Sequence, residues 1–463
     1  MTNSGKPTPP PYFNIDPETA ASRLSQPIDT LRFAKAATFA AKGRDDLAKR
    51  GYAPDGRKRL RKFSTWEVCR YLLDIAPAHL RRVLKAHPDL PQGTGEGNTK
   101  WFTLEEVLAL RDHFATEGSA AKQYKSWRPK GQPAKVIAVA NFKGGVGKTS
   151  TAAHLAMSAA LDGYRVLVID LDSQGSMTSI MGGKVEDEWQ TAFPLLARDY
   201  ARHVQAENAN RRLAGTTELP LDETLTESLE VSPRNLIQPT HWPNIDLIGA
   251  QLNLYWAEFQ VPVWRMQARS WPLWDALTNA LQTDQILEDY DIILLDTPPA
   301  LGYLTINALS AADILLVPLG ASFLEFDSTG RFFDMLYSTF ASIEEGENRL
   351  RRQDGMPEMK FEWDAVRALI TRFDASQQTD LANVIQAYFG DFMTTYRQEL
   401  TAMVGQAGEQ VNGIYEADYR EFNRDTYVRG RETFDRTWAE IKEILLGTWW
   451  RDMQMEAHED GKA

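Results

Sequence analysis

Short apolar runs recur along the chain, each bounded by charged or turn-forming residues. Six of these runs lack the apolar–polar alternation of a half-exposed strand, which predicts strands buried on both faces of a parallel sheet. They cover residues 136–141, 165–170, 245–249, 291–296, 313–318 and 365–371. Because helical stretches lie between them, we expect an α/β fold built on a doubly wound, mostly parallel sheet.

A different pattern precedes this domain and predicts a compact helical module. Ser64-Thr65-Trp66-Glu67 and Thr103-Leu104-Glu105-Glu106 both have the spacing of a capping box, which marks the start of a helix. Pro77 suits the first turn of a further helix that runs to about His87. A stretch rich in glycine and proline, 88–97, then precedes the last helix. This order is that of a winged helix-turn-helix.

These patterns predict five segments. Residues 1–28 form a polar, proline-rich tail that we expect to be disordered, and 29–56 form an N-terminal helix. The winged helix-turn-helix covers 57–115, a linker covers 116–134, and the α/β domain with a helical C-terminal part covers 135–463. Within it, 185–243 is polar and poorly periodic and is predicted to be an insertion. Five residues near the C-terminus recur at helical spacing and are expected to face the core: Phe434, Trp438, Ile441, Leu445 and Thr448.

The chemically most informative segment is a glycine-rich loop that follows the first strand of the α/β domain and opens a helix. It reads Lys143-Gly144-Gly145-Val146-Gly147-Lys148-Thr149-Ser150. Glycines let backbone N–H groups curl around phosphate oxygens, and the helix N-terminus adds a positive dipole at the same point. The Lys148 ammonium suits the β- and γ-phosphates, and the Thr149 hydroxyl suits Mg²⁺. The segment therefore predicts a phosphate-binding P-loop with ATP and Mg²⁺ as cofactors.

Acidic residues follow two other predicted strands. Asp170, Asp172 and Gln174 come after the strand 165–170, and Asp296 ends the four-aliphatic run 292–295. A carboxylate at the end of such a strand is typical of a group that binds Mg²⁺ directly or through water. We expect Thr149 and Asp296 to hold the metal.

Charge is distributed unevenly. The chain carries a net charge of −12, yet thirteen Lys or Arg face five Asp or Glu between Lys42 and Lys85. A basic module attached to an acidic body favours a DNA partner for the module, because clustered cations gain affinity by releasing counterions. In the helix that starts at Pro77, Leu80, Val83 and Leu84 form one apolar face. The predicted DNA-binding residues are Arg57, Lys58, Arg59, Arg61 and Lys62 at the start of the module, and His79, Arg81, Arg82 and Lys85 in this helix.

Other protein classes fit less well. The single cysteine, Cys69, excludes the usual paired-cysteine site of an iron–sulfur carrier. No apolar run reaches the roughly 18 residues of a membrane helix, and the acidic end 456–460 disfavours anionic lipid. We expect a cytoplasmic protein without a membrane partner.

The loop departs from the general P-loop pattern in a specific way. Phe142 stands where that pattern has glycine, and Lys143 is an additional lysine. Together with 170–174, 291–299 and Val317-Pro318, this resembles the deviant Walker motifs of the ParA/MinD family, although Ser173 replaces the family's usual proline. The module and the segment 369–373 resemble more specifically the RepA partition proteins of RepABC-type plasmids.

The resemblance implies a weak ATPase that forms a homodimer with ATP, binds DNA nonspecifically on the nucleoid, and is stimulated by a ParB-like partner. It implies plasmid partition and repression of the protein's own operon. Lys143 would reach the partner's nucleotide as a catalytic group together with Lys148 and Asp172, and Asp172 would also hold the metal. The segment 170–174 would orient the attacking water. Further nucleotide contacts would come from Asp170, Gln174, Pro318, Thr371 and Arg372. Two alternatives stay open: a transcription regulator that uses ATP as a switch, and a MinD-like positioning ATPase.

Overall fold

The computed structural model describes residues 30–49, 58–95, 100–116, 124, 128–353, 355–409 and 411–460. The predicted tail 1–28 and part of the predicted linker 116–134 lie outside these residues. The chain divides into two compact units, Met1–Asp55 and Gly56–Ala463. The first contains the helix α2, Thr30–Lys49, on which Phe33 and Phe39 are exposed.

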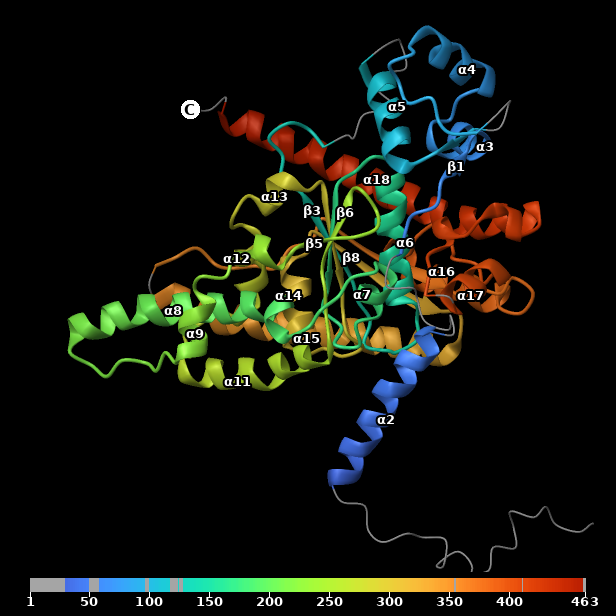
Figure 1. The fold of residues 1–463 in the computed structure, drawn as a ribbon. Coiled ribbons are helices and arrows are strands. Elements are labelled where there is room, and N and C mark those ends of the chain that lie inside the picture. The colour runs from blue at the N-terminus through green and yellow to red at the C-terminus, as the bar shows by residue number, and fades with distance from the viewer. Residues whose placement is uncertain are drawn as a thin grey trace, which may run out of the picture. The chain divides into compact units, whose positions relative to one another are not determined.

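A seven-stranded sheet forms the centre of the second unit, in the order β5-β6-β4-β7-β3-β8-β9 (Figure 1). All neighbours are parallel except β5 and β6. The strands are β3 Lys135–Val139, β4 Val166–Asp170, β5 Gln238–Pro239, β6 Ile245–Ile248, β7 Ile292–Asp296, β8 Ile314–Gly320 and β9 Ala365–Thr371. The six predicted strands and the α/β fold are confirmed, and only the short β5 was missed.

Helices cover both faces of the sheet, as two separate apolar clusters show. On one face pack α6 Lys148–Leu161 and the 37-residue α18 Arg424–Asp460. On the other lie α8 Phe193–Ala214, α11 Ala257–Gln267, α12 Ala276–Leu281, α14 Tyr303–Ala311 and α15 Phe323–Gln353. Smaller helices are α7 Ser176–Ile180, α9 Glu223–Ser228, α10 Pro233–Leu236, α13 Ile286–Asp289, α16 Thr379–Phe389 and α17 Ala402–Glu409. No helix within the described ranges is long and apolar enough to cross a membrane.

The predicted insertion 185–243 is mainly helical and belongs to the body of the domain. In α8 the side chains of Leu195, Tyr200 and Val204 are fully buried, which makes this helix part of the second apolar cluster. The C-terminal residues predicted to face the core, from Phe434 to Thr448, are all buried on α18. That prediction is confirmed.

The helical module begins with β1 Phe63–Ser64, α3 Thr65–Glu67 and a π-helical turn, η1 Val68–Leu72. It continues through α4 Pro77–Ala86, β2 Trp101–Phe102 and α5 Leu104–Thr116. Strands β1 and β2 pair antiparallel, and Thr94 forms an isolated bridge to Trp101. Both predicted capping boxes are present, at Ser64–Glu67 and Thr103–Glu106.

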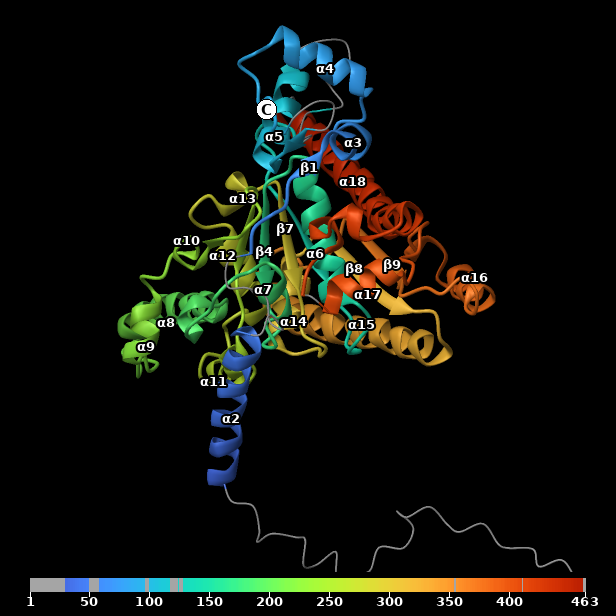
Figure 2. The ribbon, with the colours of Figure 1, turned by 45° about the vertical axis from the view of Figure 1, so that its right-hand side comes forward.

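The module and the sheet share one apolar cluster. Arg111 of α5 forms an ion pair with Asp162 at the end of α6 (3.1 Å), and Lys442 of α18 bonds to the same carboxylate. In Figures 1 and 2 the module lies at the end of the unit opposite α7 and α11. Since α6 runs between these ends, it joins the module to the end of the glycine loop over roughly 20 Å.

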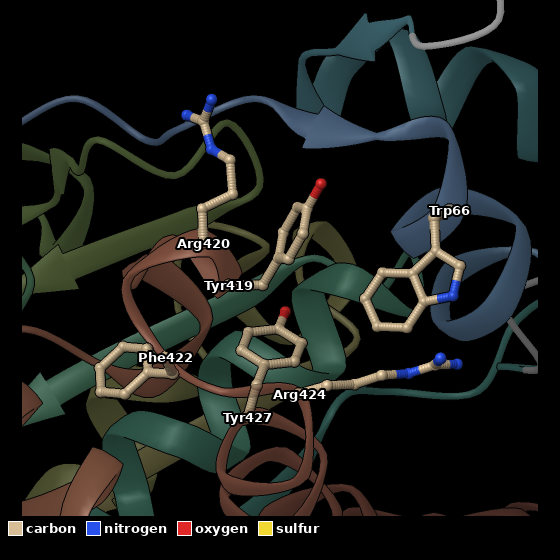
Figure 3. A pocket seen from close by; sticks show the side chains of 6 residues that line it. All are labelled: Trp66, Tyr419, Arg420, Phe422, Arg424 and Tyr427. Atoms are coloured by element: carbon tan, nitrogen blue, oxygen red, sulfur yellow. The ribbon is translucent and has the colours of Figure 1, made fainter.

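A cavity of about 520 Å³ lies where the module contacts the body (Figure 3). The Trp66 ring of the module lies 5.5 Å from the Tyr419 ring and 6.3 Å from the Tyr427 ring. Behind it, Glu67 is fully buried and accepts hydrogen bonds from Arg61 (2.7 Å) and from the Tyr427 hydroxyl (2.7 Å). Burial alone would raise the pKa of Glu67, but Arg61 and these hydrogen bonds lower it below its ordinary value.

We expect Glu67→Ala to lower the free energy of unfolding by about 3–5 kcal/mol, because it leaves Arg61 as a buried charge without its carboxylate. Urea titration at pH 7 measures the loss, with Glu105→Ala in the exposed first turn of α5 as control. Because its folded-state pKa is depressed, the Glu67 contribution is present above pH 4.5 and is lost as the pH falls below it. A loss under about 1 kcal/mol would mean that Glu67, with its hydrogen bonds to Arg61 and to Tyr427 of the body, does not hold module and body together.

Candidate functional site

The glycine loop connects β3 to α6 at the carboxyl edge of the sheet. Gly145 and Gly147 have φ angles of 78° and 84°, in the left-handed region that favours glycine. A Cβ at Gly144 or Gly145 would meet no atom within 4 Å, so the loop borders open space there. Its backbone N–H groups and the N-terminus of α6 together provide the positive concavity that binds phosphate.

The loop is held by side chains from neighbouring strands. Asn141 donates to the Pro318 carbonyl (2.8 Å) and accepts from the Lys143 N–H (3.1 Å), and the Lys148 ammonium donates to the Lys143 carbonyl (3.1 Å). Pro318 thus lies beside the loop, and its carbonyl accepts the hydrogen bond that orients the Asn141 side chain. Burial lowers the pKa of Lys148, while Asp296 and Asp172 partly oppose the shift.

Thr371 and Arg372, predicted to contact the nucleotide, bond to the loop itself. The Thr371 hydroxyl donates to the Val146 carbonyl (2.7 Å), and the Arg372 guanidinium donates to the Gly145 carbonyl (2.8 Å). Arg372 has a φ of 52°, unusual for a residue with a side chain. These two residues therefore shape the loop from the end of β9, and a contact with the base stays a prediction.

Asp296 is the most unusual carboxylate of the site. It is fully buried, and neither of its oxygens has a hydrogen-bond partner within the described ranges. Burial raises its pKa well above the ordinary value and Asp170 raises it further, whereas Thr149 and Lys148 act in the opposite direction. An unpaired buried carboxylate beside a threonine hydroxyl is a donor set that suits a hard divalent cation such as Mg²⁺.

Asp170 and Asp172 occupy the loop after β4, and Asp170 lies directly beside Asp296 in the sheet register. Asp170 accepts hydrogen bonds from the N–H and hydroxyl of Thr178 (2.8 and 2.7 Å) and from the Asp172 N–H (3.1 Å). Burial raises the pKa of Asp170 to about 7, although these hydrogen bonds lower it. Its oxygens anchor the start of α7, whereas the half-exposed Asp172 bonds only to the Gln174 N–H (3.0 Å) through its carboxylate.

The Lys143 side chain lies beside α15, where its ammonium is 3.7 Å from the Glu325 carboxylate. About a third of its side chain is exposed. Glu325 also accepts a hydrogen bond from the Gly320 N–H at the end of β8. Glu325 was not predicted from the sequence, where its one local signal is its place as the acidic residue in the first turn of α15.

Ser150 and Gln174 line a separate cavity of about 360 Å³ between α6, α7 and α17. His154, which the sequence analysis did not single out, lies there with its ring stacked on Phe434 at 3.9 Å. Its Nδ1 is 2.6 Å from the Ser150 carbonyl, and burial lowers its pKa to about 4. This neutral histidine is part of the packing beneath the loop.

Two of the cations predicted to contact DNA already have partners within the chain. Lys58 donates to the Ile180 carbonyl (2.8 Å) and the Val411 carbonyl, and Arg61 is occupied by Glu67 and the Tyr415 carbonyl. Both cationic groups therefore bind the body. Arg57 lies outside the described residues.

The cationic side chains of α4, unlike those of Lys58 and Arg61, are mostly exposed to solvent. Leu80 and Leu84 are buried and Val83 is half-buried, as predicted for the inner face of the helix. Arg81, Arg82 and Lys85 are exposed on the other faces, and His79 is half-buried with Nδ1 2.7 Å from Arg82. Arg59 and Lys62 are also exposed, so the module carries several solvent-accessible positive charges.

Fold and loop together define the class of the protein: a P-loop ATPase domain with an attached helical module. A family model described as an AAA domain matches residues 134–348. The chain is 31% identical to the putative replication protein A of Sinorhizobium fredii over 88% of its own length and 91% of that protein. It is 30% identical to protein SopA of Escherichia coli K12 over 63% of its length and 67% of SopA. A solved structure named partition protein is similar in fold, with a TM-score of 0.54, 17% identity, and coverage of 89% of this chain and 98% of that one.

The chain therefore belongs to the ParA/MinD family of deviant Walker ATPases. Its relatives in that family include the plasmid replication A proteins. The resemblance inferred from the sequence motifs is confirmed.

Proposed function

We propose that this protein is an ATP-driven DNA partition switch. The observation that carries the proposal is the joining of a deviant phosphate loop to a basic helical module through one shared core. The names of the relatives, replication protein A and SopA, support a role in plasmid maintenance. Partition, repression of the protein's own operon and association with the nucleoid all belong to this proposal.

The nucleotide half of the proposal rests on the loop and its acids. Lys148 and the loop N–H groups bind the β- and γ-phosphates of ATP, and Thr149 with Asp296 holds Mg²⁺. Bound Mg²⁺ neutralises charge on the phosphate oxygens. Asp172 orients the water that attacks the γ-phosphate, assisted by Gln174, and Asp170 is a positioning residue that anchors α7 beneath them.

The dimer half rests on Lys143. Inside its own subunit this ammonium pairs with Glu325 and is not needed for the phosphates that Lys148 already faces. In an ATP-bound homodimer it reaches the partner's nucleotide and stabilises the transferring phosphoryl group, as an arginine finger does. Intrinsic hydrolysis is weak, and a ParB-like centromere-binding protein stimulates it.

The DNA half rests on the exposed cations of α4. We expect Arg81→Ala with Arg82→Ala to weaken DNA binding and to flatten the slope of log affinity against log salt by up to about 2, because two phosphate contacts are lost. Steady-state ATP hydrolysis should stay unchanged. Fluorescence anisotropy over a salt series measures the slope.

The matched control replaces two exposed arginines of the body, Arg349→Ala with Arg352→Ala in α15. It should leave the slope unaltered. An unchanged slope in the Arg81 and Arg82 variant would move the DNA contact away from α4 and contradict this part of the proposal.

A further inference from the structure

The segment formed by η4 Leu252–Trp256 and α11 is apolar on two opposite faces. Its inner face is buried in the body through Leu254, Ala257, Val261 and Trp264. A helix that is apolar all round is ordinarily covered on all sides. Here a second row, which we call the outer stripe, is 38–70% exposed and consists of Leu252, Tyr255, Trp256, Phe259, Val263 and Met266.

The outer stripe continues through the whole segment. The spacing of its residues keeps them on one side of the helix. Within it, the Phe259 ring lies 5.2 Å from the Tyr255 ring and 5.8 Å from the Trp256 ring. A contiguous exposed row of this kind, three of its residues aromatic, marks an interaction surface.

The outer stripe lies at the same edge of the sheet as the phosphate loop. It begins directly after β6, which is parallel to β4, and the carboxyl ends of parallel strands meet at one edge. In Figures 1 and 2, α11 accordingly lies at the lower border of the body, far from the module at the top.

Hydrogen bonds connect the segment to both acidic loops of the nucleotide site. The Ala250 N–H, just before η4, donates to the Thr178 hydroxyl (2.8 Å), which in turn donates to Asp170. On its inner side, Glu258 accepts from the Tyr303 and Leu304 N–H groups (2.7 and 3.1 Å) at the start of α14. That helix follows the loop after Asp296, so the outer stripe is attached to both loops that border the γ-phosphate.

We propose that the outer stripe is a contact surface for a second copy of this chain in the ATP-bound dimer. The proposal rests on the proposed function, which brings a second copy to this edge so that Lys143 can reach its nucleotide. Two copies that each carry −12 charges repel one another, and an uncharged stripe is a surface on which they can meet. The two charged residues of α11 face away from it, Glu258 toward α14 and Arg265 toward Trp274 and Glu347.

The size of the outer stripe is sufficient for such a contact. Aromatic side chains bury about 150–250 Å² each when fully covered. Three of them and three aliphatic side chains, contributed by each of two copies around a two-fold axis, reach the roughly 1,000 Å² of a specific interface.

The test is Trp256→Ser with Phe259→Ser, two exposed positions whose loss leaves the inner face intact. Sedimentation velocity with a non-hydrolysable ATP analogue should show dimerisation at least 10-fold weaker than in wild type, while calorimetry shows unchanged binding of the analogue. The matched control, Leu213→Ser with Tyr388→Ser, removes two large side chains elsewhere that are even more exposed, and it should dimerise like wild type.

If the stripe variant dimerises as strongly as wild type, the inference is overturned. This holds even if that variant no longer binds DNA, because the outer stripe would then contact a partner other than a second copy of the chain. A wild type that stays monomeric with the ATP analogue overturns the proposed function itself. The two failures are therefore distinguishable.

Discussion

Lys148→Ala is expected to abolish ATP binding at the concentrations at which wild type is saturated. The Lys148 ammonium is the main fixed charge that faces the phosphates, and hydrogen bonds to charged groups contribute about 1.5–3 kcal/mol each. Loss of two such bonds weakens binding roughly 10²- to 10⁴-fold. Isothermal titration calorimetry with ATP and Mg²⁺ measures this loss directly.

Lys184→Ala is the control for this experiment, because Lys184 is exposed and lies in the segment after α7, outside the phosphate loop 143–150. Circular dichroism of the Lys148 variant shows whether the fold is retained. ATP binding within about threefold of wild type would contradict the assignment of the loop as the nucleotide site.

Asp172→Ala is expected to slow ATP hydrolysis by about 10²-fold or more, the usual contribution of a positioned group in proton transfer or water orientation. ATP binding should be kept, because the carboxylate bonds only to the Gln174 N–H and holds no part of the phosphate loop. The variant should accumulate as an ATP-bound dimer. Single-turnover hydrolysis together with calorimetry separates the two effects.

Asp187→Ala serves as control, since it removes an exposed carboxylate in the turn before η3 Glu188–Gln190. If turnover of the Asp172 variant equals that of wild type, Asp172 does not orient the water. If ATP binding is lost as well, Asp172 acts in binding, and the division of roles between Asp172 and Lys148 is wrong.

The strands of the fold could be predicted because a buried parallel strand is a continuous aliphatic run that needs no distant information. That the predicted insertion 185–243 packs into the body of the domain could not be predicted from its sequence, for a physical reason. The buried face of α8 includes Arg198 and Asn208, which interrupt its apolar periodicity. Likewise, the capping box at Ser64 predicted the start of a helix, but not that the helix continues as the π-helical turn η1.

The phosphate loop could be predicted because its chemistry lies in eight consecutive residues. The residues that support it could not, since they come from distant parts of the chain. Thr371 and Arg372 bond to carbonyls more than 220 residues away, and Arg61 bonds to Tyr415 across 354 residues. A run of cationic residues in the sequence shows where positive charge lies. It does not show whether these side chains already bond to distant parts of the folded chain.

The central claim is that ATP joins two copies of this chain through Lys143. Sedimentation velocity of wild type and Lys143→Ala, each saturated with a non-hydrolysable ATP analogue, tests it most directly, with Lys184→Ala as control. The account predicts a dimer for wild type and for the control, and a nucleotide-bound monomer with little ATP turnover for Lys143→Ala. Equal dimerisation and equal hydrolysis of wild type and Lys143→Ala would contradict it.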